Sequence, residues 1–129
     1  MQITQLEQAG VIVETAARYR VAIDIGSYTP VETLADVSAD AMLVSHLHRD
    51  HFSVPQIQAL APTTAYLNRE CIDLWGDEPA KSQIVEVKVG DSRDLGGGVR
   101  VTFFDVDHGP NVTTLPKENF GFLHLRLTR

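Results

Sequence analysis

The sequence predicts an α/β (α+β) fold over a single domain, residues 1–129. Hydrophobic residues make up 43% of the 129 residues and charged residues 22%, a balance typical of globular proteins rather than disordered chains. Short runs rich in isoleucine and valine alternate along the chain with segments that carry helix-start signals. Strands and short helices are therefore both expected, within the usual size range of one domain.

Strands are expected where the chain is rich in apolar and β-branched residues. These segments are residues 2–7, 10–17, 19–25, 41–45, 63–67, 83–89 and 99–107. A turn containing Gly96, Gly97 and Gly98 is expected to join the last two strands. No lysine followed by serine or threonine comes after this turn, so we interpret it as a plain turn rather than a phosphate-binding loop.

Three short helices are expected, each announced by a residue that can cap its first turn. Thr29 precedes Pro30 and predicts a helix or turn to about Asp36. Ser53-Val54-Pro55-Gln56 forms a capping box that opens a helix to about Leu60. The third helix is expected to start after Asn68, to run through Trp75 and to end at Gly76.

The segment His46-Leu47-His48-Arg49-Asp50-His51 follows the short buried strand directly and contains four potential metal ligands. Residues two apart on an extended strand point to the same side, so His46 and His48 can aim at one point. Asp50 continues that register, whereas His51 breaks it and can face a second point nearby. Imidazole and carboxylate ligands suit zinc, and also iron or manganese.

A histidine-rich surface loop is the alternative interpretation of this segment. A lone histidine is usually a surface or hydrogen-bonded core residue. Three of the five histidines of the chain, however, fall within these six positions together with an aspartate. We therefore favour metal binding.

His-x-His-x-Asp-His after a hydrophobic strand resembles the signature of the metallo-β-lactamase superfamily of metal-dependent hydrolases. Val21-Ala22-Ile23-Asp24-Ile25-Gly26 looks like the early strand of that family, which ends in an Asp-x-Gly turn. Asp107-His108-Gly109 lies where the family supplies its next histidine ligand, and Asn119-Phe120-Gly121-Phe122 resembles the following strand. The layout looks closer to the branch that includes ascorbate-6-phosphate lactonase than to the glyoxalase-like branch.

The resemblance implies an αββα sandwich and a catalytic metal centre. His46, His48 and His108 would hold one Zn²⁺, while Asp50 and His51 would begin a second site, with Mn²⁺ or Fe²⁺ as other possible ions. The implied reaction is hydrolysis by metal-activated water, with Asp50 as the catalytic residue that holds the second metal or orients the water. Asp24 could orient a metal ligand without itself contacting the ion, or cap the turn at Gly26, or do both.

Members of this family are usually longer and are built from two similar halves. After the strand that contains Phe122 they supply a Gly-Asp segment and a final histidine ligand, whereas this sequence stops at Arg129. We therefore expect the chain to be the first half of the sandwich, truncated at its C-terminus, and inactive or weakly active alone. The alternative function is a non-catalytic metal-binding or ligand-sensing module on the same fold.

Charge and cysteine content limit the partners and the compartment. A net charge of −6 with scattered lysines and arginines argues against nucleic acid as a partner. The sequence has no apolar run of membrane-spanning length and no room for a signal peptide before the first strand, and its single cysteine, Cys71, fits a cytoplasmic protein.

The expected partner is a small substrate, which we expect to be anionic because a helix N-terminus follows the ligand loop. The scissile bond, whether in an ester, a lactone or a phosphodiester, and the oligomeric state are not indicated.

Overall fold

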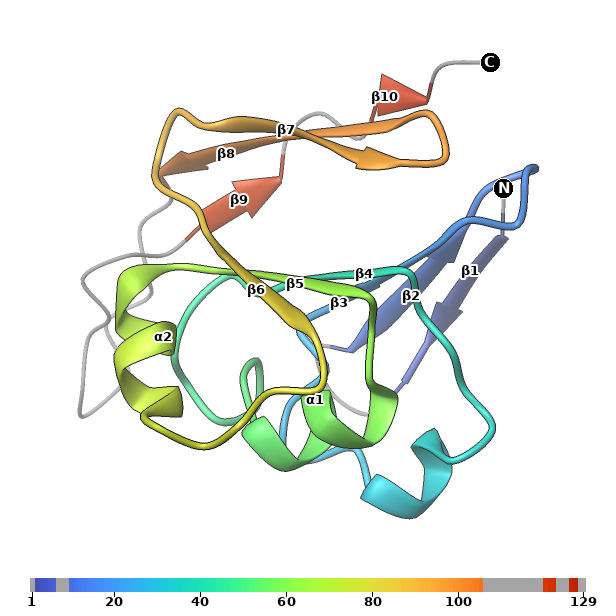
Figure 1. The fold of residues 1–129 in the computed structure, drawn as a ribbon. Coiled ribbons are helices and arrows are strands. Elements are labelled where there is room, and N and C mark those ends of the chain that lie inside the picture. Colours follow the sequence, from blue (N-terminus) through green and yellow to red (C-terminus); the bar gives the residue numbers. More distant parts are fainter. Residues whose placement is uncertain (1, 7–9, 106–119, 123–125, 128–129) are drawn as a thin grey trace.

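The computed structural model describes residues 2–6, 10–105, 120–122 and 126–127, with two β-sheets stacked face to face (Figure 1). The first sheet has six strands, in the same order in space as along the chain. They are β1 (Gln2–Gln5), β2 (Val11–Glu14), β3 (Arg20–Ile23), β4 (Ala41–Leu43), β5 (Thr64–Leu67) and β6 (Gln83–Glu86). β1, β2 and β3 pair antiparallel, whereas β3, β4, β5 and β6 pair parallel. The parallel strands therefore share one edge at their carboxyl ends.

The second sheet is smaller and entirely antiparallel. Its members are β7 (Ser92–Gly96), β8 (Val99–Asp105), β9 (Phe120–Phe122) and β10 (Arg126–Leu127), and β8 pairs with each of the other three. β7 is an addition to the expected strands, because only the glycine turn was anticipated between residues 89 and 99. The strand expected at residues 83–89 ends at Glu86.

Three short helices cover the face of the first sheet that lies opposite the second sheet (Figure 1). They are the 3-10 helix η1 (Val31–Leu34), α1 (Val54–Leu60) and α2 (Arg69–Trp75). Each crossover between parallel strands contains one helix, which is the usual way for a chain to return to the same edge of a sheet. None of the helices in the described ranges could cross a lipid bilayer.

The observed helix caps match the predicted ones at α2 and differ from them at η1 and α1. The side chain of Asn68 accepts a hydrogen bond from the backbone N–H of Cys71 at 2.9 Å, and α2 ends at Gly76 as expected. Before η1 the capping position is occupied by Pro30 rather than Thr29. Ser53 does precede α1, but its hydroxyl donates to the side chain of Gln56 instead of accepting from the helix backbone.

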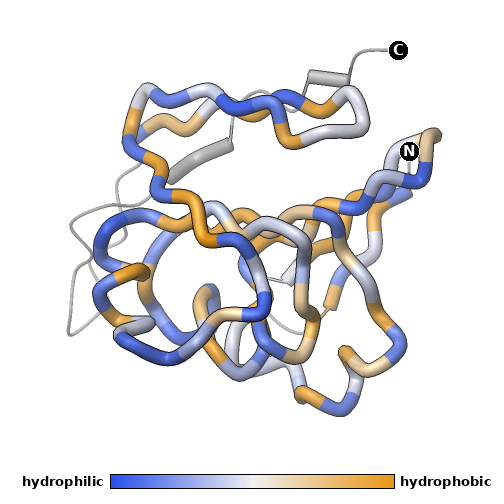
Figure 2. The backbone as a smooth tube through the Cα atoms, viewed as in Figure 1, coloured by the Kyte–Doolittle hydropathy of each residue, from blue (hydrophilic) through white to orange (hydrophobic). Residues whose placement is uncertain are grey.

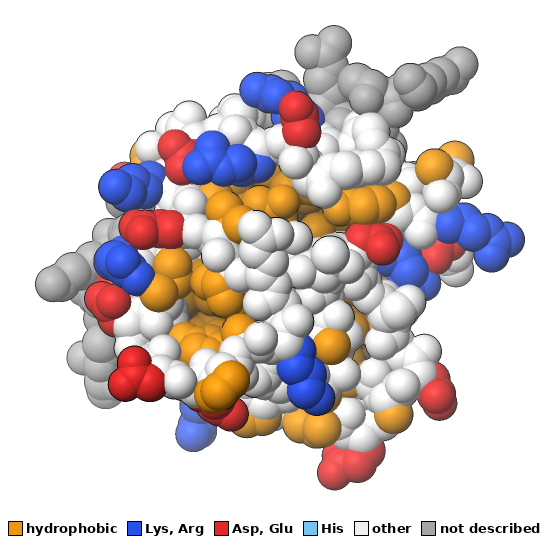
Figure 3. Space-filling view, viewed as in Figure 1, with side chains coloured by type: hydrophobic (Ala, Val, Ile, Leu, Met, Phe, Trp, Pro, Cys, Tyr) orange, Lys and Arg blue, Asp and Glu red, His pale blue; other side chains and the backbone are white. Residues whose placement is uncertain are grey.

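Two hydrophobic clusters lie on opposite faces of the first sheet. The central strand β4 contributes to both, because Met42 faces the helices while Ala41 and Leu43 face the second sheet. Figure 2 shows hydrophobic stretches along the central strands, and Figure 3 shows hydrophobic side chains gathered between the two sheets. A strand buried on both faces must be apolar at every position, which explains its continuous hydrophobic run.

Tyr19 joins the first sheet to the turn between β7 and β8. Its hydroxyl donates to the carbonyl oxygen of Leu95 at 2.5 Å, and its ring lies against Gly96 and Gly97. A Cβ on Gly97 would lie 2.4 Å from Cγ of Tyr19, and Gly97 also has a φ of +58°. The glycine turn therefore serves close packing, consistent with our interpretation of it as a structural turn.

We expect the free energy of unfolding to fall as the pH rises from 10 to 12. Burial, followed by the negative charge that Tyr66 and Asp40 can carry, raises the pKa of Tyr19 from 10.0 to about 12. A pKa that is higher in the folded state contributes stability that is complete below pH 10.0 and is lost as the pH approaches 12. Urea unfolding at several pH values should show a shallower fall in Tyr19→Phe; an equal slope would contradict this assignment.

Candidate metal centre

The histidine-rich loop begins where two neighbouring parallel strands end. Ile23 of β3 pairs with Leu43 of β4, so Asp24 and the Ser45-His46 segment leave the sheet side by side. The backbone N–H of Asp24 donates to the carbonyl oxygen of Leu43 at 3.0 Å and fixes this alignment. The carboxyl edge of parallel strands is where ligands commonly bind in α/β folds. The loop thus lies at a favourable edge of the first sheet.

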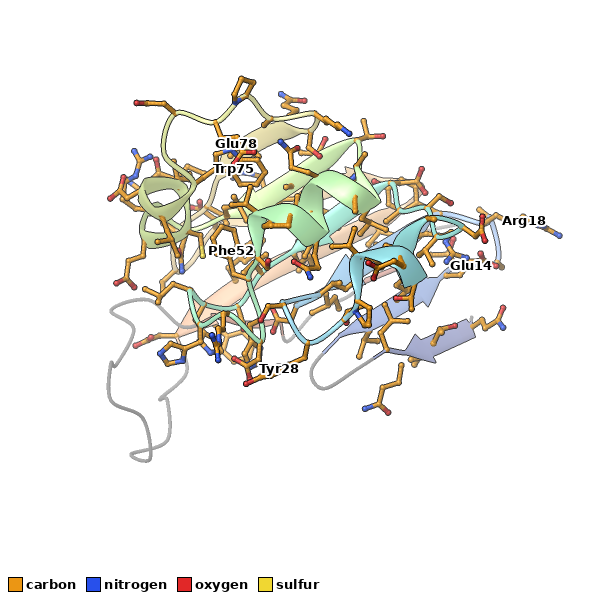
Figure 4. The ribbon with its side chains drawn as sticks, turned by 90° about the horizontal axis from the view of Figure 1, so that it is seen from below. Glu14, Arg18, Tyr28, Phe52, Trp75 and Glu78 are labelled. Carbon is orange, nitrogen blue, oxygen red and sulfur yellow. The ribbon has the colours of Figure 1, made fainter. Side chains whose placement is uncertain are left out.

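A tight turn and a buried aromatic ring hold the shape of the loop. The backbone N–H groups of His51 and Phe52 both donate to the carbonyl oxygen of His48 at 2.8 Å. Phe52 is buried at 2% exposure and lies beside Trp75 of α2, with the ring centroids 6.5 Å apart (Figure 4). The loop is therefore anchored in the helix-side core immediately after its last candidate ligand.

Gly26 lets a second loop approach the backbone of the ligand loop. The N–H of Ser27 donates to the carbonyl oxygen of Arg49 at 2.6 Å. A Cβ at position 26 would lie 2.2 Å from the carbonyl carbon of Asp50 and 2.4 Å from the carbonyl oxygen of Arg49. Only a residue without a side chain fits this contact.

Asp24 is the centre of a buried hydrogen-bond network behind the histidines. One carboxylate oxygen, Oδ1, accepts from the backbone N–H of Ser45 at 2.7 Å, and the other, Oδ2, accepts from its hydroxyl at 2.6 Å. Oδ2 also lies 2.9 Å from Nδ1 of His51, and the hydroxyl oxygen of Ser45 lies 2.8 Å from Nδ1 of His46. Asp24 thus contacts the candidate ligand His51 as an orienting residue would, while its role toward a metal stays a prediction.

The loop brings four of the five predicted ligands into one neighbourhood. The ring of His46 lies 4.1 Å from that of His51 and 5.0 Å from that of His48, measured between centroids. Asp50 joins this group, because its Oδ2 lies 3.2 Å from Nε2 of His51. His46 is buried at 4% exposure, whereas the other three are partly exposed. The fifth predicted ligand, His108, lies outside the described residues.

The electrostatic environment favours the charged form of His51. Burial lowers the pKa of this imidazole, but the hydrogen bond to Asp24 and the charges of Asp24 and Asp50 more than offset that effect. The net result is a pKa above the ordinary value of 6.5. The neighbourhood is therefore one that stabilises positive charge, as a cation site must.

The donor set suits a zinc-like metal in kind, although the described residues do not by themselves complete a site. Imidazole nitrogens with a carboxylate are ligands that zinc, iron and manganese accept. Within residues 2–6 and 10–105 and the two short terminal strands, no three such side chains are already grouped around one point as an ion requires. The described part of the chain thus offers donors of a suitable kind but no complete ligand set.

Two residues of this region escaped the sequence analysis. Ser45 precedes the motif and carried no signal of its own, and its role depends on the register between β3 and β4. Gly26 was recognised only as the end of a turn. A glycine after a strand that ends in aspartate suggests a close approach, but the partners in that approach, Arg49 and Asp50, are 23 and 24 residues further along the chain.

An open hollow lies beside the loop, toward α2. It is lined by Leu47 of the loop and by Glu70, Asp73 and Leu74 of the helix, and has a volume of about 430 Å³. Leu74 is 61% exposed. This hollow combines apolar and acidic side chains next to the candidate metal centre.

No family profile and no curated protein matches the sequence. Solved structures do match its fold. A protein of Parabacteroides distasonis, provisionally described as a metal-dependent hydrolase, superposes with a TM-score of 0.69 at 17% identity, covering 93% of this chain and 53% of its own. The metallo-β-lactamase fold protein YhfI of Bacillus subtilis gives 0.59 at 18% identity, covering 88% and 48%.

CmlA of Streptomyces venezuelae, a diiron β-hydroxylase, gives a TM-score of 0.64 at 15% identity and covers 93% of this chain and 26% of its own. The chain thus spans about half the length of the first two matched proteins. Identities this low bear on the fold alone. Two stacked sheets with helices over the outer face of the first, and a histidine-rich loop at its carboxyl edge, show that this chain has the metallo-β-lactamase fold.

Proposed function

We propose that the protein to which this chain belongs is a metal-dependent hydrolase. The observation that carries the proposal is the cluster of His46, His48, Asp50 and His51 at the carboxyl edge of the first sheet, supported from behind by Asp24. A ligand whose second nitrogen is held by a carboxylate is typical of metal centres. A hydrogen bond to a buried carboxylate is not expected for a histidine that only faces solvent.

In this proposal His46 and His48, together with His108, hold one ion, and Asp50 and His51 contribute to a second. A metal held by these residues would lower the pKa of its bound water toward about 7 and polarise the bond to be cleaved. In the same proposal the carboxylate of Asp50 orients the attacking water or holds the second ion, which its partial exposure and its contact with His51 support. Zn²⁺ is the proposed ion, with Mn²⁺ or Fe²⁺ as the other candidates.

The proposed substrate is a small anionic molecule with an ester, lactone or phosphodiester bond. The attraction for an anion would come from the metal and from the exposed Arg49 rather than from α1, which has only seven residues. Leu47 and Leu74 in the neighbouring hollow offer apolar contact for an uncharged part of the molecule, whereas Glu70 and Asp73 would keep its anionic group out of the hollow. A relationship to the ascorbate-6-phosphate lactonase branch and a cytoplasmic location belong to the same proposal.

We expect His48→Ala to reduce hydrolysis by at least about 100-fold in the protein translated from the whole reading frame. Loss of an outer-shell partner alone costs roughly 10–100-fold in metal affinity or activity, and loss of a ligand should cost at least as much. Asp50→Ala should also impair hydrolysis. The measurement is a screen of generic ester, lactone and phosphodiester substrates, with and without a chelator.

Cys71→Ala provides the matched control. Cys71 is fully buried in α2 and packs in the helix-side hydrophobic cluster, so its replacement should change activity little. Activity that survives both the chelator and His48→Ala would refute the proposal. Tight metal binding without any hydrolysis would favour a non-catalytic metal-binding module, and turnover that needs iron and dioxygen would favour an oxygenase.

A further inference from the structure

The hydrogen bonds of Ser45 and Asp24 determine which ring nitrogen of His46 and of His51 carries the proton. Asp24, as a carboxylate, can only accept hydrogen bonds, whereas the Ser45 hydroxyl has a single proton to donate. The 2.6 Å contact with Oδ2 of Asp24 uses that proton. The Ser45 oxygen can therefore only accept from Nδ1 of His46 across their 2.8 Å contact. This requires the proton of a neutral His46 ring to lie on Nδ1.

The same carboxylate oxygen fixes the second ring. Nδ1 of His51 lies 2.9 Å from Oδ2 of Asp24, which again can only accept. Nε2 of the same ring lies 3.2 Å from Oδ2 of Asp50, which is a longer contact. A neutral His51 is therefore expected to keep its single proton on Nδ1, at the closer carboxylate. In both rings the nitrogen that keeps a lone pair is Nε2, the atom able to bind a cation.

We propose that Asp24 and Ser45 are positioning residues that hold His46 and His51 in the same Nδ1–H tautomer, so that both present Nε2 to the metal centre. Asp24 acts on His51 directly and on His46 through the Ser45 hydroxyl. The single buried carboxylate of Asp24 thereby fixes the tautomers of two histidines that the proposed function assigns to different ions. The role toward metal rests on the proposed function, whereas the position of the protons does not.

The geometry gives two substitutions with different expected outcomes. Ser45→Ala removes the relay to His46 and leaves the contact between Asp24 and His51 intact. Asp24→Asn should act on both rings. If its amide oxygen keeps the bond to the backbone N–H of Ser45, its NH₂ group replaces Oδ2 and donates, so Ser45 can donate to His46 and His51 loses its acceptor. The backbone of residue 24 has a φ of 52°, which asparagine tolerates.

The test is ¹⁵N NMR of the histidine rings in the metal-free protein, at a pH well above the pKa of both rings. Long-range correlations to the ring protons distinguish a protonated nitrogen from one with a lone pair. We expect Nδ1–H for His46 and His51 in the wild type. In Ser45→Ala only His46 should lose this preference, and in Asp24→Asn both should shift toward Nε2–H. Ser45→Thr should restore the wild-type pattern.

Ser53→Ala serves as the control, because that serine bonds Gln56 outside the network and its loss should leave both tautomers unchanged. Wild-type rings in the Nε2–H form would overturn the inference even if a variant failed to fold. An unchanged His46 in folded Ser45→Ala would overturn the relay.

Zn²⁺ titration separates this inference from the proposed function. We expect Asp24→Asn to weaken Zn²⁺ binding roughly 10–100-fold. In the protein translated from the whole reading frame, both rings in the Nδ1–H form without any Zn²⁺ binding would refute the proposed function and support the proton placement. Wild-type affinity retained in Asp24→Asn, with both tautomers changed, would overturn the role toward metal.

Discussion

Gly26→Ala is expected to displace the ligand loop and to destabilise the fold by about 3 kcal/mol or more. The added methyl group would overlap main-chain atoms of Arg49 and Asp50, at distances of 2.2 to 2.4 Å that real contacts do not show. Main-chain atoms cannot rotate away as a side chain can, so the loop must shift as a unit. Urea unfolding and Zn²⁺ titration of the same samples would measure both consequences.

Ser27→Ala is the matched control for this substitution. Ser27 is exposed, and the hydrogen bond that it donates to Arg49 comes from its backbone, which the substitution leaves in place. Its stability and Zn²⁺ affinity should equal those of the wild type. A Gly26→Ala protein with wild-type stability and affinity would show that the two loops do not touch as described.

Phe103→Ala is expected to lower the free energy of unfolding by about 3–5 kcal/mol. Phe103 is a large, fully buried side chain of β8 and packs in the cluster between the two sheets. Its backbone bonds to Gly90 and Asp91 would remain, so the loss would come from the cavity and the missing apolar contact. Because folded proteins are stable by only about 5–15 kcal/mol, this is a large fraction of the total.

Arg100→Ala on the same strand is the control for Phe103→Ala. Arg100 is exposed, and its ion pair with Asp94 at 2.9 Å involves two exposed side chains, so its loss should cost no more than about 1 kcal/mol. Urea midpoints of the two variants give the comparison. Equal midpoints would mean that the two sheets do not share a core through β8.

The sequence predicted the first sheet and the ligand loop because their signals are local. Continuous apolar character identified β4, and Asn68 marked the start of α2 through its own side chain. The same apolar run predicted that His46 and His48 follow a strand, and β4 does end three residues before His46. Signals of this kind need no knowledge of the rest of the chain.

Features that depend on distant segments could not be predicted. β7 has the sequence Ser-Arg-Asp-Leu-Gly, which lacks an apolar pattern, and its strand conformation comes from pairing with β8. The role of Ser45 likewise requires that β3 and β4 lie in one register, since Asp24 is 21 residues earlier in the chain. Pairing between strands, rather than local preference, decided both cases.

The left-handed backbone conformation at Asp24 limits which residue types position 24 can accommodate. A φ of 52° suits glycine, asparagine and aspartate, and penalises most other side chains. Of these three, only aspartate offers two acceptor oxygens to Ser45 and His51 together. Aspartate thus meets both the backbone requirement and the hydrogen-bonding requirement at position 24. A redesign of the centre that changed residue 24 to glutamate would keep the charge and lose the turn, while one that chose glycine would keep the turn and lose the charge.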